Sequence, residues 1–230
     1  MPEFPFRCVA FDLDGTIADT APDLAASLNH TLATMERPQL ALAEVRALVG
    51  HGTRAMLRGG FAATGSCDDA LVEQGYPILM RHYESNICNM TRPYPGVEHA
   101  MDCLFEAGAV LALCTNKPEH LARKLVEALG WSARFAALVG GDTLAVAKPD
   151  PAPLRLALER ALGDVAGRRQ AAFVGDSIVD MQTAHAVGVP GIAVTFGYAD
   201  RPVEQLGATE TIDHFDELVR CLRQIGRPKN

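Results

Sequence analysis

Five short apolar runs recur along the chain, and helix-like stretches lie between them. The runs cover residues 7–11, 109–114, 136–139, 171–174 and 191–195. Such short runs are typical of strands that are buried on both faces of a parallel sheet. Residues 119–129 and 151–162 carry apolar side chains at i, i+3 and i+4 spacing, with a proline near the start of each stretch. This alternation of strands and helices predicts an α/β fold with a parallel sheet.

Residues 18–91 interrupt the alternation. This interval shows no clear strand, and four stretches in it have a helical pattern, at residues 21–35, 41–48, 53–63 and 69–83. The segment Pro93-Tyr94-Pro95-Gly96 is expected to return the chain to the sheet. We therefore predict a Rossmann-like parallel sheet core with helices on both faces, at residues 1–17 and 92–230, and an inserted all-helical cap domain at residues 18–91.

Composition narrows the classes of partner. The chain has 230 residues, a hydrophobic share of 48% and a formal net charge of −7. This charge argues against nucleic acid or an anionic membrane as a partner, so an anionic substrate needs a locally cationic site. No apolar run approaches the roughly 18 residues of a membrane span. The six cysteines form no C-x-x-C pair, and no basic, apolar leader opens the chain. We expect a cytoplasmic protein, either a monomer or a homodimer.

Side chains that can do chemistry follow successive predicted strands. The first strand leads into Asp12 and Asp14, and the period of two along a strand aims both carboxylates at one point. The later strands lead into Thr115-Asn116-Lys117, into the loop that carries Lys148, and into Gly175-Asp176-Ser177 with Asp180 four residues after Asp176. Ligands bind at the carboxyl ends of strands in such sheets. Helix capping explains a single loop aspartate, but it does not explain this whole set.

In this order, the motifs resemble the haloacid dehalogenase superfamily of phosphotransferases. The matching stretches are Asp12-Leu13-Asp14-Gly15-Thr16, Thr115-Asn116, Lys148-Pro149 and Gly175-Asp176-Ser177-Ile178-Val179-Asp180. The resemblance covers nearly the whole chain, because the helical insert stands where that superfamily has its cap. It implies an enzyme that transfers a phosphoryl group through an aspartyl-phosphate.

The resemblance also implies a role for each residue. Asp12 is expected to be the nucleophile, and Asp14 the general acid and base. Mg²⁺ is expected to bind the Asp12 carboxylate, the Asp14 backbone carbonyl and Asp176, with Asp180 orienting these ligands. Thr115 and Lys148 are expected to bind the phosphoryl oxygens, and Asn116 is expected to bind the substrate. Two interpretations stay open for Thr16, which either contacts the phosphate or caps a turn.

Further motifs indicate a subgroup. Asp14 separates the chain from the dehalogenases that attack carbon, and the lack of lysine in residues 18–91 separates it from phosphonate hydrolases. Residues 19–25, 48–52, 141–144 and 148–154 resemble the phosphoglycolate phosphatases. A small phosphorylated metabolite, most of all 2-phosphoglycolate, is therefore the expected substrate. The alternatives are another small-molecule phosphatase, a β-phosphoglucomutase-like mutase and a non-catalytic binding protein on this scaffold.

Residues 50–55 form a glycine-rich loop within the predicted cap. Their pattern fits the dinucleotide fingerprint G-x-G-x-x-A, but that fingerprint requires a preceding strand, which is missing here. We expect instead a cap loop at a helix N-terminus, where backbone N–H groups favour anions. Gly50, His51, Gly52 and Arg54 are then candidates to bind the substrate. The alternative is that His51 is a turn residue and Arg54 is solvated.

Overall fold

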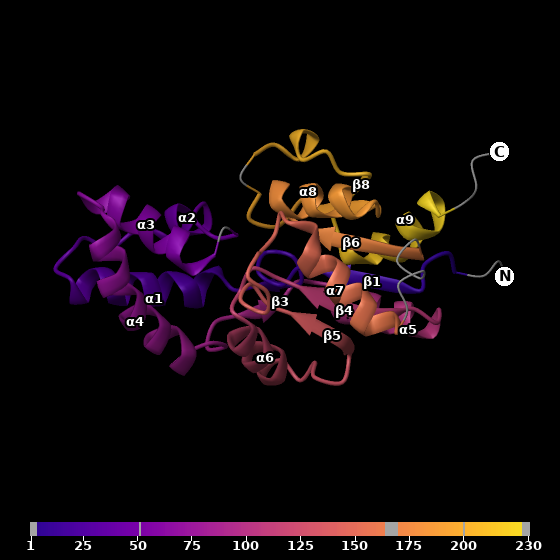
Figure 1. The fold of residues 1–230 in the computed structure, drawn as a ribbon, viewed down its shortest axis with the longest axis horizontal. Helices are drawn as coiled ribbons and strands as arrows, with labels where there is room; N and C mark the ends of the chain where they lie inside the picture. Colours follow the sequence, from indigo (N-terminus) through magenta and orange to yellow (C-terminus); the bar gives the residue numbers. More distant parts are fainter. Residues whose placement is uncertain (1–3, 51, 164–169, 200, 227–230) are drawn as a thin grey trace.

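A six-stranded parallel sheet forms the centre of the molecule. The computed structural model describes residues 4–50, 52–163, 170–199 and 201–226. The strands follow the order β5-β4-β1-β6-β7-β8, and Figure 1 shows β5, β4, β1 and β6 one after another in this order. Their bounds are Cys8–Phe11 for β1, Val110–Cys114 for β4, Phe135–Val139 for β5, Ala171–Gly175 for β6, Gly191–Val194 for β7 and Glu210–Ile212 for β8. The predicted α/β fold is confirmed. Strand β8 is not among the predicted strands, because this edge strand is largely exposed and lacks an apolar run.

Helices cover both faces of the sheet because alternate strand residues point to opposite sides. On one face, Val9 and Phe11 of β1 pack with α5 (Val97–Glu106), α6 (Glu119–Ala128) and α9 (Leu218–Ile225). On the other face, Cys8 and Ala10 pack with α7 (Pro151–Leu162) and α8 (Ile178–Val187). Two short 3₁₀ helices, Val203–Gln205 and Phe215–Glu217, lie in the C-terminal part. The central strand β1 is thereby held from both sides.

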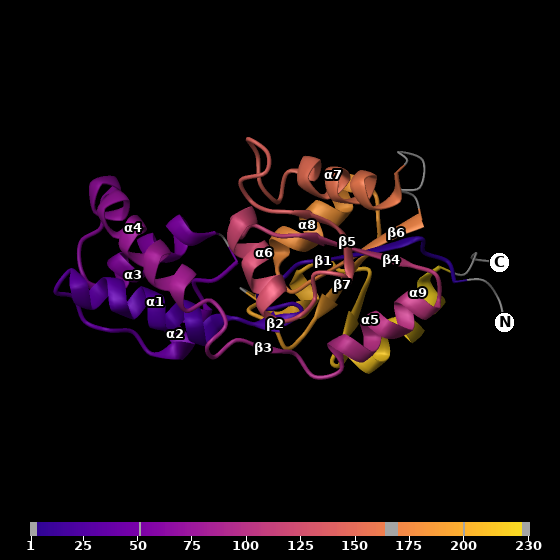
Figure 2. The same ribbon diagram turned by 90° about the horizontal axis from the view of Figure 1, so that it is seen from below.

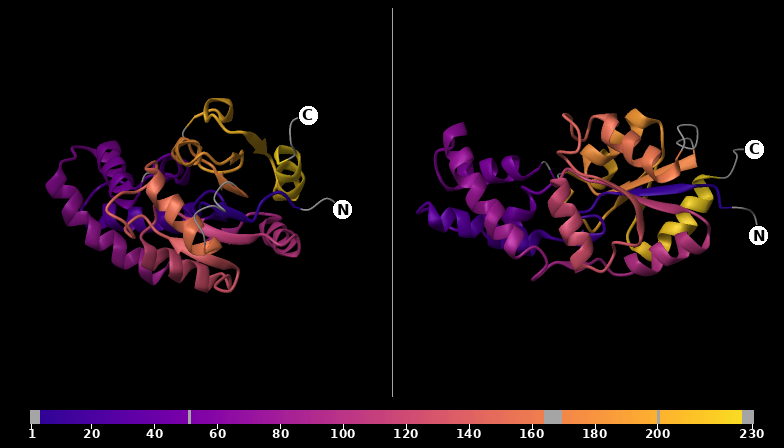
Figure 3. Two further views of the ribbon diagram at one scale, coloured as in Figure 1. Left: turned by 45° about the vertical axis from the view of Figure 1, so that its right-hand side comes forward. Right: turned by 60° about the horizontal axis from the view of Figure 1, so that its bottom comes forward.

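Four helices of the N-terminal part gather at one end of the molecule (Figure 3). They are α1 (Ala21–Thr34), α2 (Leu42–Arg46), α3 (Thr53–Thr64) and α4 (Asp69–Ser85). All four predicted cap helices are present, and we call these four the cap helices. Close packing needs small residues between them, since a Cβ added at Gly75 of α4 would lie 2.7 Å from the Phe61 ring. Among the described residues, no helix is both long and apolar enough to cross a membrane.

A two-stranded antiparallel ribbon connects the cap helices to the sheet. Strand β2 (Ala18–Asp19) pairs with β3 (Arg92–Pro93), and Figure 2 shows both between the cap helices and the sheet. The expectation that residues 18–91 contain no strand is therefore wrong at Ala18–Asp19. Two residues are too few to leave a periodic signal in a sequence. The exact boundaries of the two predicted domains stay a prediction.

A buried carboxylate fixes the return of the chain from the cap helices. Asp23 of α1 accepts hydrogen bonds from the backbone N–H of Met90 at 3.0 Å and of Thr91 at 2.8 Å. Its Oδ2 atom also accepts one from the Thr91 hydroxyl at 2.7 Å. Because the entering and leaving segments are tied together at this point, the cap helices meet the sheet through a defined pair of connections.

Candidate active site

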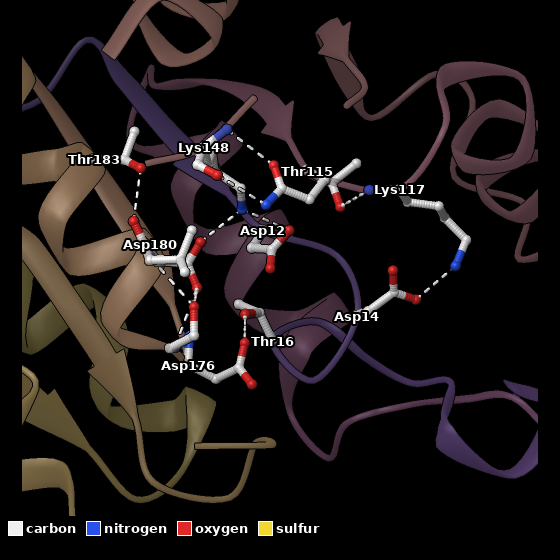
Figure 4. A network of polar contacts seen from close by, with 12 residues as sticks. Asp12, Asp14, Thr16, Thr115, Lys117, Lys148, Asp176, Asp180 and Thr183 are labelled. Atoms are coloured by element: carbon white, nitrogen blue, oxygen red, sulfur yellow. Dashed lines mark hydrogen bonds and ion pairs between the residues drawn. The ribbon is translucent and has the colours of Figure 1, made fainter. Parts of the chain in front are cut away.

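The carboxyl ends of β1, β4 and β6 bring the predicted catalytic residues together (Figure 4). Asp12 follows β1 directly, and its backbone N–H donates to the Val174 carbonyl of β6 at 2.9 Å. Its Oδ1 atom lies 3.0 Å from the Lys148 ammonium. That ammonium also lies 2.6 Å from Oδ1 of Asp180. The predicted nucleophile and the predicted lysine therefore form one buried cluster.

The side-chain amide of Asn116 holds the backbone of Lys148 in place. The Asn116 amide donates to the Lys148 carbonyl at 3.1 Å, and the Lys148 N–H donates back to Asn116 Oδ1 at 3.0 Å. Burial alone would lower the pKa of Lys148, but Asp12 and Asp180 outweigh it and raise that pKa above its usual value. Lys148 thus stays charged beside Asp12. The described contacts of the Asn116 amide are with this backbone, and its role in binding substrate stays a prediction.

Three carboxylates, those of Asp12, Asp176 and Asp180, lie close together at this cluster. Oxygen atoms of Asp12, Asp176 and Asp180 all lie within 4.8 Å of one another, and all three residues are buried. Burial, followed by repulsion from Asp180, raises the pKa of Asp176 well above its usual value. Burial is also the main reason that the pKa of Asp12 rises to about 6. A bound cation would compensate this concentration of negative charge, so the donor set fits a metal ion with oxygen ligands.

The members of this acidic cluster have different partners. Asp176 accepts hydrogen bonds from the Thr16 hydroxyl at 2.8 Å and from the Tyr198 N–H at 2.7 Å. Asp180 accepts one from the Ser177 hydroxyl at 2.6 Å, in addition to its ion pair with Lys148. Both oxygens of Asp180 are thereby occupied, which agrees with an orienting role. The structure places Thr16 against Asp176, a contact that neither interpretation of Thr16 had named.

Glycine is required where the Asp14 turn passes over the cluster. Gly15 has a φ of +81°, and a Cβ there would lie 2.4 Å from Oδ2 of Asp176. Such a backbone angle and such a close approach are both unfavourable for any residue with a side chain. The Asp-x-Asp-Gly pattern therefore lets the first loop approach the carboxylate that follows β6.

Asp14 points toward the cap helices and pairs with Lys117. Lys117 is not among the predicted site residues. The Lys117 ammonium lies 2.7 Å from Oδ1 of Asp14, and both side chains are nearly excluded from water. The Thr20 hydroxyl donates to the same oxygen at 2.6 Å. A signal for Lys117 was available, because it stands in the segment Thr115-Asn116-Lys117 that directly follows β4. The carboxyl end of a strand in a parallel sheet is where ligands bind.

A cavity of about 40 Å³ lies between the sheet and the cap helices. Its core side includes Asp12, Asp14, Thr115, Asn116 and Lys117, and its cap side includes Val49, Gly50, Gly52, Met56 and Tyr83. A single water needs roughly 10–15 Å³ by this measure, so the cavity suits a small ligand. The reactive carboxylates thus open into a small space that the cap helices cover.

Comparison with known proteins agrees with this geometry. The family model for haloacid dehalogenase-like hydrolases matches residues 9–194, which include Asp12, Asp14, Lys148 and Asp176. The chain belongs to this family.

Named relatives of this haloacid dehalogenase-like hydrolase are similar over most of their length. A phosphoglycolate phosphatase of Mesorhizobium japonicum is 46% identical over 95% of this chain and 97% of its own. One of Caulobacter vibrioides is 43% identical over 93% and 89%. The crystal structure of a predicted phosphoglycolate phosphatase from Haemophilus somnus superposes with a TM-score of 0.87 at 29% identity, covering 94% and 98% of the two chains.

The glycine-rich loop of this haloacid dehalogenase-like hydrolase lies partly at the cavity. Gly50 and Gly52 line it with φ of +107° and +89°, and Gly52 precedes α3 without a capping side chain. Arg54 instead pairs with Glu73 at 2.8 Å and lies over the Tyr76 ring, 3.8 Å from its centre. Arg54 therefore lies away from Asp12 and Asp14 and is not among the residues that line the cavity. His51 lies outside the described residues, so its predicted role is not addressed.

Proposed function

We propose that this protein is a Mg²⁺-dependent phosphatase that hydrolyses 2-phosphoglycolate to glycolate and phosphate. The observation that carries the proposal is the pairing of two carboxylates with two lysines at one strand end. Asp12 lies beside Lys148, and Asp14 lies beside Lys117. Each carboxylate has its own environment, which is how two similar groups take different roles in one reaction.

Asp12 acts as the nucleophile. Its carboxylate oxygen bonds to the phosphorus atom while the bond from phosphorus to the ester oxygen breaks, giving an aspartyl-phosphate. Lys148 favours the ionised form of Asp12 that this attack requires. Thr115 lines the cavity beside Asp12 and is the proposed hydrogen-bond donor to a phosphoryl oxygen. Water then attacks the phosphorus atom and releases phosphate, which regenerates Asp12.

Asp14 moves the protons. It protonates the leaving ester oxygen in the first step and takes a proton from the attacking water in the second. Lys117 and Thr20 both donate to Oδ1 of Asp14. These contacts fix the position of Oδ1, and the other carboxylate oxygen is proposed to face the reacting group.

Mg²⁺ would be held by Asp12, Asp176 and the Asp14 carbonyl, while Asp180 orients them. When bound, the ion reduces the repulsion between carboxylate and phosphate and polarises the phosphoryl group. The buried acidic cluster supports a cation, and Mg²⁺ in particular is proposed because it favours carboxylate oxygens together with substrate phosphate.

The choice of substrate rests on the relatives and on the cavity. Relatives at 42–46% identity carry the name phosphoglycolate phosphatase, and the cavity of about 40 Å³ suits a small ester. Gly52 and Thr53, at the start of α3, line this cavity from the cap side, and the backbone N–H groups of this helix start are proposed to approach the substrate carboxylate. Arg54 would have to leave Glu73 in order to join them.

Phosphate release from a panel of phosphomonoesters tests the proposal, with Mg²⁺ and with EDTA, for the wild type and for Asp12→Asn. We expect metal-dependent turnover with the highest kcat/KM for 2-phosphoglycolate, and its loss in Asp12→Asn. A higher kcat/KM for another ester would overturn the substrate and retain the chemistry. No turnover from folded, metal-loaded protein would favour a mutase or a binding protein.

A further inference from the structure

One buried hydroxyl at the cavity has no acceptor for its proton. Tyr83 of α4 is 2% exposed and its hydroxyl lies beside Lys117, which can only donate, so no described residue accepts the hydrogen bond that this hydroxyl can make. A buried hydroxyl without a partner is unfavourable, and native structures seldom leave one unless it serves a purpose. Tyr83 lines the cavity, so a ligand there can accept the hydrogen bond that the protein leaves unmade.

Lys117 stands next to this hydroxyl from the opposite side of the cavity. Its ammonium lies 4.6 Å from the centre of the Tyr83 ring and 2.7 Å from Asp14 (Figure 4 shows the latter contact). An ammonium has three N–H donors, and Asp14 Oδ1 accepts only one of them. A cation of the core and a phenol of the cap helices thus converge on one point beside the general acid.

The position of that point defines what it can recognise. Asp14 must face the ester oxygen that leaves, so the rest of the substrate lies beside Lys117 and Tyr83. In 2-phosphoglycolate a single CH₂ group separates the ester oxygen from the carboxylate. The carboxylate therefore falls next to the ester oxygen, within reach of both groups. Esters whose anionic group is farther away, or absent, leave the Tyr83 hydroxyl unpaired.

We infer that Tyr83 and Lys117 are a specificity-determining pair that recognises a carboxylate one carbon away from the scissile ester oxygen. The Tyr83 hydroxyl donates to one carboxylate oxygen, and the Lys117 ammonium donates to the carboxylate while it holds Asp14. The second oxygen remains available to the backbone N–H groups of α3. The inference rests on the proposed phosphatase function, and it assigns the choice of substrate to a contact across the two parts of the molecule.

Ethyl phosphate is the matched probe, because it has the same length as 2-phosphoglycolate and a methyl group in place of the carboxylate. The measured quantity is the ratio of kcat/KM for 2-phosphoglycolate to kcat/KM for ethyl phosphate. We expect Tyr83→Phe to lower this ratio about 10- to 100-fold, since a hydrogen bond to a charged group is lost. The variant keeps the ring against Lys117 and removes a hydroxyl that donates to no protein group, so it should fold. Tyr76→Phe, on the same helix, should leave the ratio unchanged.

The outcomes separate the inference from the function on which it rests. If the wild type hydrolyses neither ester, the phosphatase proposal is wrong. If it hydrolyses both but Tyr83→Phe lowers the two kcat/KM values equally, or lowers neither, the specificity pair is wrong. A binding measurement adds a readout without turnover. In the Asp12→Asn background, calorimetry should show that Tyr83→Phe raises the Kd for 2-phosphoglycolate by a similar factor, and an equal Kd would overturn the inference.

Discussion

The two sides of the cavity are built in different ways. On the core side, the ammonium groups of Lys117 and Lys148 lie within 3.0 Å of carboxylate oxygens, and all of these groups are nearly excluded from water. On the cap side, the lining includes Gly50, Gly52 and Thr53, apolar side chains, and Tyr83, whose hydroxyl has no acceptor among the described residues.

This difference indicates a division of labour. The core side is fixed before substrate arrives, and fixed charges aimed at a reacting group are the largest source of rate enhancement in many enzymes. In the proposed reaction these charges face the phosphoryl group, which every phosphomonoester shares. The cap side has hydrogen-bonding capacity that only a ligand can use, and it faces the part of the ester that varies. Substitutions on the core side should therefore affect all esters, and substitutions on the cap side should affect some.

The largest expected effect comes from Asp12→Asn. An amide cannot form the aspartyl-phosphate, so kcat should fall more than about 10⁴-fold for every ester. Phosphate release under saturating Mg²⁺ measures the loss, and Asp180→Asn is a control that removes a neighbouring carboxylate without removing the nucleophile. If Asp12→Asn kept more than one per cent of activity, Asp12 would not be the nucleophile.

Asp14→Asn should have the next largest effect, and that effect should depend on the leaving group. Loss of a general acid and base lowers kcat by roughly 10²–10⁴-fold. An aryl phosphate has a leaving group that departs without a proton, so the first step should be impaired much less for it than for 2-phosphoglycolate. A burst of phenol release followed by slow turnover would show that only dephosphorylation is slow. An equal loss of the first step with both esters would contradict the assignment.

The sequence alone predicts the core side of the cavity better than the cap side. Asp12, Thr115 and Asp176 stand directly after strands, and the backbone of a parallel sheet fixes where such residues lie. These positions can therefore be predicted from the sequence. Lys117 follows β4 in the same segment as Thr115, but it lies outside the motifs on which the prediction was based. The edge strand β8 was missed because edge strands carry little apolar signal.

The cap side could not be predicted in this way. Tyr83 occupies a buried position of the amphipathic helix α4 and looks in sequence like an ordinary core aromatic. Only the tertiary packing of α4, which lies against α1 and α3, places Tyr83 at the cavity. Arg54 looked like a candidate anion ligand, but α3 packs beside α4 and thereby brings Glu73, nineteen residues later, within 2.8 Å. Side-chain direction at helix–helix contacts depends on the tertiary structure.

The pH dependence of the stability of the metal-free protein tests the buried charge on the core side of the cavity. Burial raises the pKa of Asp12 from its usual 3.8 to about 6, so the folded state binds this proton more tightly than the unfolded state does. Stability of the metal-free protein should therefore fall as the pH rises from about 4 to 6, by about 3 kcal/mol for this group.

Asp12→Asn removes this penalty because it removes the charge. In EDTA at pH 8, chemical denaturation should show the variant about 3 kcal/mol more stable than the wild type, and the difference should disappear near pH 4. Adding Mg²⁺ should stabilise the wild type more than the variant. If the variant were less stable than the wild type at pH 8 without metal, burial of the ionised Asp12 carboxylate would not lower the stability of the protein.

The smallest effect is expected on the cap side, at the pair of Arg54 and Glu73. Both side chains are more than half exposed, so their ion pair contributes little to stability. If Arg54 leaves Glu73 to approach bound 2-phosphoglycolate, Arg54→Ala should raise KM a few-fold and Glu73→Gln should lower it by a similar factor. Ethyl phosphate should show neither change, and raised salt should diminish both. If KM for 2-phosphoglycolate is the same in both variants as in the wild type, Arg54 is a surface residue, and carboxylate recognition on the cap side is left to α3 and Tyr83.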